Sequence, residues 1–381
     1  MGRIKVLLVF GTRPDAIKMA PLYLELKRRP EFECLACVTA QHRKMLDDVL
    51  DAFGIKPDYD LDLMKEDQTL AYITAGVLTG LGEVLRREKP ALVLVHGDTT
   101  TAFSAALAAF YEKIPVGHVE AGLRSYDRYF PFPEEMNRCL AGRLAEYHFA
   151  PTARNAENLR RENIMGKIFI TGNTVIDAMK YTVGDGAFKT PALAALNFTS
   201  RRVIVMTCHR RESYGEAIAG IFRAVRRVAE SFDDVSVVYP VHLSPYIRET
   251  ASKILGGAPN ILLIDPLDAA EMHRLISKCF FVMTDSGGLQ EEAPALGKPV
   301  LVLRRETERP EAVESGTVSL AGVDENAVYT CACALLNNDS EYDRMARAVN
   351  PYGDGNACPR IADAISHCFG GGSARPEDFC P

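Results

Sequence analysis

Two successive series of short apolar segments, each alternating with helical patterns, constrain the fold of this chain more than any other feature. The first series comprises residues 4–10, 34–39, 91–96, 116–119, 147–150 and 167–171. The second comprises residues 203–207, 235–240, 261–264, 280–284, 299–303 and 317–320. Continuous apolar runs of strand length are typical of parallel strands that helices cover on both faces. The pattern therefore predicts an α/β protein with two Rossmann-like domains, each with a parallel sheet.

The domain boundary is predicted near Gly172, which gives domains of residues 1–172 and 173–354. A last helical pattern at about 355–369 is expected to pack back on the first domain, and the polar tail 370–381 is expected to be disordered. Ligands of such sheets bind beyond the carboxyl ends of the strands. We therefore expect the two sheets to face a central cleft.

Charge and hydropathy exclude several functions. The formal net charge of −6 argues against a nucleic-acid partner. No apolar run is long enough to span a membrane, and the N-terminus leads directly into a predicted strand, so we expect no membrane association and a cytoplasmic protein. The ten cysteines are expected to be free thiols, with Cys34 and Cys37 on opposite faces of one strand.

The segment 284–311 carries the clearest ligand signature. An apolar strand ends there at Ser286-Gly287-Gly288, and a helical pattern begins immediately afterwards. Backbone N–H groups at the start of a helix, together with its dipole, attract phosphate. Carboxylates and arginines follow within the same strand-helix-strand unit, namely Glu291, Glu292, Arg304, Arg305 and Arg309. This combination indicates a nucleotide.

Polar residues also follow five other predicted strands. They are Arg13 and Lys18, Asp98, Glu120, His209 and His242. Each has a purely structural explanation: Asp98 could cap a helix, Glu120 could pair with Arg124, and His242 could be an ordinary loop histidine. Because all of them lie where strands end, a shared ligand site explains the pattern better.

One further carboxylate lies in a predicted helix rather than at a strand end. Glu134 and Arg138 are spaced i, i+4 and so can meet on one helix face. Such a pair is either part of the scaffold or a positioned acid or base, and the residues alone leave both alternatives open.

Eight motifs together resemble the non-hydrolysing UDP-N-acetylglucosamine 2-epimerase family over residues 3–369. They are FGTRPDAIKMAPL, TAQHRKMLDDVL, VHGDTTTAF, HVEAGLRS, FPEEMNR, HRRESYG, DSGGLQEEAPALGKPVLVLR and ERPEAVESGT. The resemblance implies the GT-B architecture and reversible conversion of UDP-GlcNAc to UDP-ManNAc. The reaction would eliminate UDP to give 2-acetamidoglucal and then add it back, without metal or cofactor. It also implies a homodimer that supplies ManNAc units for cell-surface polysaccharide.

The resemblance also implies roles for individual residues. The carboxylates for proton transfer and charge stabilisation would be Asp98, Glu120 and Glu134, with Arg138 holding Glu134 and His209 acting at the diphosphate. The substrate-binding residues would be Arg13, Lys18, His242, Ser286, Gly287, Gly288, Glu292 and Arg309, with Glu292 accepting the ribose hydroxyls.

Several positions depart from the family pattern. Asp15 replaces the usual glutamate, and Met272 lies where an aromatic residue often contacts uracil. Members regulated by a second UDP-GlcNAc carry a further pattern, of which this chain keeps Gln41 and His42 but not the residues expected at Lys44 and Asp67. Allosteric activation therefore stays open. So do three alternative functions: a GT-B glycosyltransferase using a UDP-sugar, a 2-epimerase of a modified UDP-2-acetamido sugar, and a nucleotide-sugar binding module.

Overall fold

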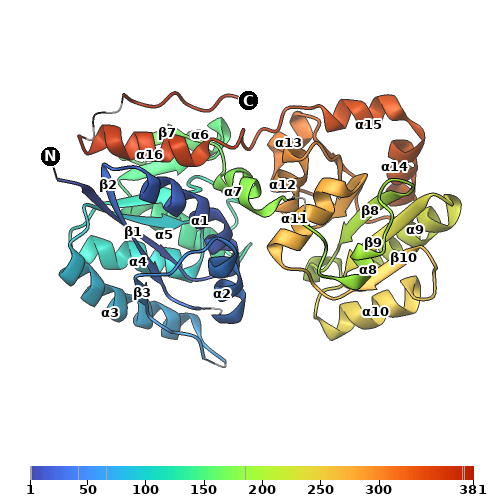
Figure 1. Ribbon diagram of the computed structural model, residues 1–381, viewed down its shortest axis with the longest axis horizontal. Coiled ribbons are helices and arrows are strands. Elements are labelled where there is room, and N and C mark those ends of the chain that lie inside the picture. Colours follow the sequence, from blue (N-terminus) through green and yellow to red (C-terminus); the bar gives the residue numbers. More distant parts are fainter. Residues whose placement is uncertain (1, 42, 66, 185, 371, 373) are drawn as a thin grey trace. The chain divides into compact units, whose positions relative to one another are not determined.

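The computed structural model describes residues 2–41, 43–65, 67–184, 186–370, 372 and 374–381. The chain forms two compact units, Met1–Tyr181 with Tyr352–Pro381, and Thr182–Pro351 (Figure 1). The division falls after Tyr181 and not after Gly172 as predicted, because helix α7 (Thr174–Thr182) places Ala178 in the core of the first unit.

The first unit contains a seven-stranded parallel sheet in the order β3-β2-β1-β4-β5-β6-β7. Its strands are β1 (Ile4–Phe10), β2 (Phe32–Val38), β3 (Tyr59–Asp60), β4 (Leu92–His96), β5 (Val116–Val119), β6 (Tyr147–Ala150) and β7 (Lys167–Ile170). Its helices are α1 (Arg13–Arg28), α2 (Arg43–Ala52), α3 (Leu70–Glu88), α4 (Thr100–Tyr111), α5 (Glu134–Leu144), α6 (Ala153–Arg161), α7 and α16 (Ala357–Cys368).

Side chains of β1 and β2 alternate between the two faces of this sheet, and both faces are buried. Val6, Leu8 and Phe10 pack in a cluster that includes residues of α1, α2 and α16, whereas Leu7 and Val9 pack with residues of α3 and α4. The same alternation confirms the prediction that Cys34 and Cys37 face opposite sides, since each belongs to a different cluster.

The second unit contains a six-stranded parallel sheet in the order β10-β9-β8-β11-β12-β13. Its strands are β8 (Arg202–Thr207), β9 (Val235–Pro240), β10 (Ile261–Ile264), β11 (Phe281–Thr284), β12 (Val300–Val302) and β13 (Val318–Leu320). Its helices are α8 (Pro191–Ala194), the 3-10 helix η1 (Arg211–Ser213), α9 (Glu216–Ser231), α10 (Pro245–Leu255), α11 (Ala269–Lys278), α12 (Leu289–Ala295), α13 (Pro310–Glu314), α14 (Glu325–Asn337) and α15 (Asp339–Ala346). The predicted class of two parallel-sheet α/β domains is confirmed.

The C-terminal segment belongs to the first unit. Helix α16 packs against α1 (Figure 1), and Arg29 Nη1 lies 2.5 Å from Asp363 Oδ1. The expectation of a disordered tail is wrong for residues 374–381. The Phe379 N–H donates to the Ile170 carbonyl at 2.7 Å, and the Phe379 side chain is buried. The reason is that β7 is an edge strand, whose unpaired backbone groups accept another segment of chain.

Among the described residues, no helix is both long and apolar enough to cross a membrane. All ten cysteines are free thiols.

Candidate functional site

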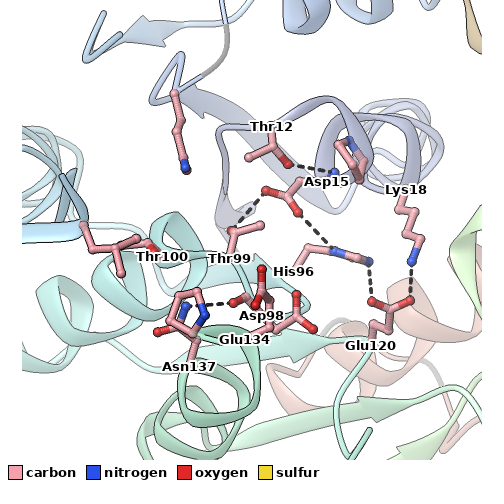
Figure 2. Close-up of a pocket in the computed structure, with 14 residues that line it drawn as sticks. Thr12, Asp15, Lys18, His96, Asp98, Thr99, Thr100, Glu120, Glu134 and Asn137 are labelled. Carbon is pink, nitrogen blue, oxygen red and sulfur yellow. Dashed lines mark hydrogen bonds and ion pairs between the residues drawn. The ribbon is translucent and has the colours of Figure 1, made fainter. Parts of the chain in front are cut away.

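The carboxyl ends of β1, β4 and β5 lead into a polar pocket of about 360 Å³ in the first unit (Figure 2). Four carboxylates line this pocket: Asp15, Asp98, Glu120 and Glu134. Lys18 and His96 lie among them. The parallel sheet explains the convergence, because loops that follow neighbouring parallel strands meet at the same edge.

Glu120 is held by several contacts at the end of β5. Its carboxylate forms an ion pair with Lys18 and accepts a hydrogen bond from Asn173 Nδ2 at 2.9 Å. The backbone of Glu120 has a φ of +62°, a conformation that costs a residue with a side chain on the order of 1–3 kcal/mol. The surface pair of Glu120 with Arg124 that the sequence allowed does not form. The Arg124 side chain is buried, and its Nε lies 2.6 Å from Glu162 Oε1.

Asp98 lies two residues beyond the end of β4 and is bound by residues of α5. Arg138 Nη2 donates to Asp98 Oδ2 at 2.5 Å, and Asn137 Nδ2 donates to the Asp98 carbonyl at 2.9 Å. Removal from water raises the pKa of Asp98, and the Glu120 carboxylate raises it further, while Arg138 opposes both effects. Asp98 is therefore suited to hold a proton more readily than an ordinary aspartate.

The predicted contact between Arg138 and Glu134 is wrong. Arg138 instead donates to Asp98 and, at 3.2 Å, to Glu135 Oε2. Glu135 is buried and also accepts the backbone N–H groups of Ser125 and Tyr126, so it is the scaffold carboxylate of this helix. Glu134, the first residue of α5, lines the pocket.

Arg13 and Lys18 have different environments although both lie on α1. Lys18 lines the pocket and contacts Glu120. Arg13 begins the helix, is half-buried, and is not among the described residues that line the pocket.

His96 is a pocket residue that the sequence reading passed over. It is the last residue of β4 and is only 3% exposed. Its ring lies between two carboxylates, with Nδ1 3.7 Å from Asp15 Oδ1 and Nε2 3.8 Å from Glu120 Oε2 (Figure 2). Its position at a strand end was the available signal, but the residue was assigned to the apolar strand itself.

In the second unit, the loop between β11 and α12 contains Ser286, Gly287 and Gly288. An ideal Cβ on Gly288 would lie 3.1 Å from Glu292 Oε1, so a larger residue would crowd that carboxylate. An ideal Cβ on Gly287 would lie 3.5 Å from Arg309 Nη2, which places the guanidinium group beside the loop. Glycines, a carboxylate and an arginine therefore lie together, as predicted from the segment 284–311.

Two buried partners orient the charged residues beside this loop. Arg309 Nε donates to Glu291 Oε1 at 2.5 Å. His273 Nε2 lies 3.2 Å from Glu292 Oε2, while its Nδ1 lies 2.7 Å from Thr182 Oγ1. Glu291 was noted only as a carboxylate and His273 was missed, because their roles depend on residues distant in sequence.

Asp285 orients His209 at the end of β8. This fully buried carboxylate accepts the backbone N–H groups of His209 and Arg210 at 2.6 and 2.7 Å. His209 Nδ1 lies 3.4 Å from Asp285 Oδ1, and 39% of the His209 side chain is exposed. The ring of His242 stacks on that of His209 with centroids 5.0 Å apart. His209 is thus oriented from one side and open to a ligand on the other.

Of the residues considered for regulation, His42 lies outside the described residues. Within the part of the chain that the structure describes, no group of three or more His, Cys, Asp or Glu side chains is arranged to hold a metal ion.

Comparison with known proteins identifies the family. Residues 24–366 match the family described as UDP-N-acetylglucosamine 2-epimerase. The UDP-N-acetylglucosamine 2-epimerase of Bacillus subtilis is 53% identical over 380 residues, which cover 100% of this chain and 99% of the relative.

Two solved structures agree with this assignment. UDP-GlcNAc 2-epimerase from Neisseria meningitidis, bound to UDP-GlcNAc, is 47% identical with a TM-score of 0.87 and covers 95% of this chain and 99% of its own. The S. aureus MnaA–UDP co-structure is 50% identical with a TM-score of 0.89, and the match covers 99% of this chain and 100% of that structure's chain. The chain therefore belongs to the UDP-N-acetylglucosamine 2-epimerase family.

Proposed function

We propose that this protein interconverts UDP-GlcNAc and UDP-ManNAc by inverting C2 of the sugar. UDP would leave from C1 with the bonding electrons while the C2 proton is removed, which gives 2-acetamidoglucal. Re-addition of UDP, with a proton delivered to the opposite face of C2, would give the epimer. The observation that carries the proposal is the pocket of the first unit, which four carboxylates line together with Lys18 and His96.

The chemistry requires groups that exchange protons in a site shielded from water. The C2 hydrogen is not next to a carbonyl, so its removal needs a well-placed base and stabilisation of charge at C1 and C2. Asp98, Glu120 and Glu134 would provide these functions. The raised pKa of Asp98 supports a role in proton transfer, because a carboxyl group with a higher pKa binds and returns a proton more readily near neutral pH.

The departing diphosphate requires positive charge and N–H donors. Arg309 beside the glycine loop supplies the first requirement, and the backbone of residues 286–288 would supply the second. His209, oriented by Asp285 and partly exposed, would act at the same diphosphate. Glu292, contacted by His273, would accept the ribose hydroxyls. Arg13, Lys18 and His242 would complete the substrate contacts.

We further propose that the enzyme acts in the cytoplasm as a homodimer and that its product supplies ManNAc units for polysaccharide. The free state of all ten cysteines fits a reducing compartment. Light scattering coupled to gel filtration would measure the mass of the assembly, and a monomer at micromolar concentration would contradict the dimer.

Incubation with UDP-GlcNAc alone in D₂O tests the activity. The proposal expects UDP-ManNAc with deuterium at C2 and deuterium also in the recovered UDP-GlcNAc. A glycosyltransferase would leave the C2 hydrogen in place and turn over only when an acceptor is added. Unchanged, unlabelled UDP-GlcNAc combined with turnover of a modified UDP-2-acetamido sugar would assign the other epimerase activity.

A further inference from the structure

We propose that His96 is a positioning residue that bridges Asp15 and Glu120 and maintains Glu120 as a proton-transfer group. This inference rests on the proposed epimerase function and extends it to a buried residue that lines the same pocket. Both ring nitrogens are buried, so His96 would act through the neighbouring carboxylates.

The buried ring of His96 lacks hydrogen bonds. Within the described residues, neither Nδ1 nor Nε2 of His96 has a hydrogen-bond partner. A buried polar atom without a partner costs free energy, so each one calls for a specific explanation. The two carboxylate oxygens facing the ring lie at 3.7 and 3.8 Å, just beyond hydrogen-bonding distance.

The carboxylates of Asp15 and Glu120 are anchored independently of His96. Thr99 Oγ1 donates to Asp15 Oδ2 at 3.1 Å, and the Asp15 backbone N–H is bound by Thr12 Oγ1. Glu120 is held by Lys18 and by Asn173, as described above. Figure 2 shows the imidazole between these two fixed groups. Each of the two gaps would have to shorten by about half an ångström to reach hydrogen-bonding distance.

The His96 ring can accept a proton from Glu120 and return it. When Glu120 takes a proton from the substrate it becomes a carboxylic acid, and Nε2 of a ring that donates Nδ1–H to Asp15 can accept the Glu120 O–H. If the proton passes to Nε2, Glu120 is again a carboxylate and an imidazolium lies between two carboxylates. The reverse transfer returns the proton to Glu120. The bridge therefore allows Glu120 to accept a proton, to share it with the imidazole and to return to its carboxylate form.

His96→Gln, His96→Asn and His96→Leu test the bridge with different geometries. The amide of glutamine reaches the place of Nε2 next to Glu120, whereas that of asparagine reaches only the place of Nδ1. We expect His96→Leu and His96→Asn to lower kcat at least about 100-fold and His96→Gln only about tenfold, with KM and UDP affinity nearly unchanged. His148→Gln, on strand β6 of the same sheet and also buried, serves as the matched control and should retain wild-type kcat.

A primary isotope effect separates positioning from mere structural support. With UDP-GlcNAc deuterated at C2, the isotope effect on kcat/KM should be larger in His96→Gln than in the wild type, because slower proton transfer becomes more rate-limiting. An unchanged isotope effect together with a lowered Tm would overturn the proposal in favour of a structural role. Wild-type kcat in all three variants would overturn it as well.

Asp15→Asn provides the second test if the His96 variants do not fold. It should lower kcat about tenfold with the same increase in the isotope effect, and an unchanged isotope effect would contradict the bridge. If the wild type itself does not exchange the C2 hydrogen, the epimerase function fails, and the bridge fails with it. If the wild type does so and the variants behave like it, only the bridge fails.

Discussion

The two units of this protein have closely related folds but opposite chemistry at the ends of their strands. In the first unit, the strands lead to four carboxylates, of which Glu120 pairs with Lys18 and Asp98 with Arg138. In the second, they lead to glycines, to Arg309 and to a partly exposed histidine. One Rossmann-like scaffold thus presents groups suited to proton transfer and the other presents groups suited to anion binding. The difference lies in the loops, since both sheets are parallel and buried on both faces.

The contrast also extends to the way in which each set of side chains is held. Asp98 and Glu120 are fixed by ion pairs and amide donors from helices and loops distant in sequence. In the second unit, buried carboxylates orient neighbouring residues: Asp285 accepts the His209 backbone N–H, and Glu291 accepts a hydrogen bond from Arg309. We therefore expect mutations in the first unit to alter turnover and mutations in the second to alter nucleotide affinity.

The largest expected effect belongs to Glu134→Gln in the first unit. Loss of a positioned acid or base should lower kcat about 10²- to 10⁴-fold, while the affinity for UDP stays within about twofold. Steady-state kinetics and calorimetric titration with UDP measure the two quantities. Glu135→Gln is the matched control: it removes the carboxylate that accepts two backbone N–H groups and should lower Tm. Equal losses of kcat and UDP affinity in Glu134→Gln would return Glu134 to a scaffold role.

A smaller effect is expected from the corresponding change in the second unit, Glu292→Gln. Weakening the acceptor for the ribose hydroxyls should reduce UDP affinity about tenfold, equivalent to about 1.4 kcal/mol, with kcat at saturating substrate nearly unchanged. Titration with 2′-deoxy-UDP and 3′-deoxy-UDP would identify the hydroxyl concerned. A large fall in kcat without a change in affinity would reverse the assignment of the two units.

Acid should destabilise the first unit, which contains two buried histidines on neighbouring strands. Burial lowers the pKa of His118 to about 3 and that of His148 to about 4, from an ordinary value near 6.5. Below pH 6.5 the unfolded chain binds protons that the folded chain does not, so the free energy of unfolding falls as pH decreases. The loss for each histidine is about 2 kcal/mol at pH 5 and vanishes above about pH 7.

Hydrogen exchange measured peptide by peptide between pH 7.5 and 5 would test this prediction. Exchange should accelerate in β5 and β6 at the lower pH after correction for the intrinsic rate. His148→Leu should remove part of this pH dependence. A wild-type first unit equally protected at both values would show that the histidines are not held neutral by burial.

The smallest effect is expected from deletion of residues 374–381. The deletion removes the buried Phe379 and its hydrogen bond to Ile170, so Tm should fall by roughly 2–6 °C. Calorimetry measures this change, and kcat and UDP affinity should not alter. A tail that can be removed without any change in Tm would restore the original expectation of a disordered segment.

The sequence predicted the strands well because they are buried on both faces and therefore read as continuous apolar runs. It missed β3, which has only two residues and pairs at the edge of the first sheet. It also missed the ordered tail, because the tail is held by backbone groups of β7 and carries little apolar pattern of its own. The boundary was placed too early, since most of α7 belongs to the first unit, which extends to Tyr181.

The site was predicted less completely than the fold. Residues at strand ends, such as Asp98, Glu120 and His209, could be identified because topology places them at a ligand-binding edge. Their partners could not, since each contact joins distant segments. Arg138 illustrates the limit: helical spacing favoured Glu134, whereas the tertiary fold brings Asp98, 40 positions away in the sequence, to the guanidinium group.

The division of chemistry between the two units is tested most directly by Asp98→Asn, assayed in D₂O for deuterium at C2 and by titration with UDP. We predict that deuterium incorporation falls by at least about 100-fold while the dissociation constant for UDP stays within about twofold of the wild-type value. Undiminished incorporation of deuterium, or a loss of UDP affinity in proportion to the loss of exchange, would contradict the account.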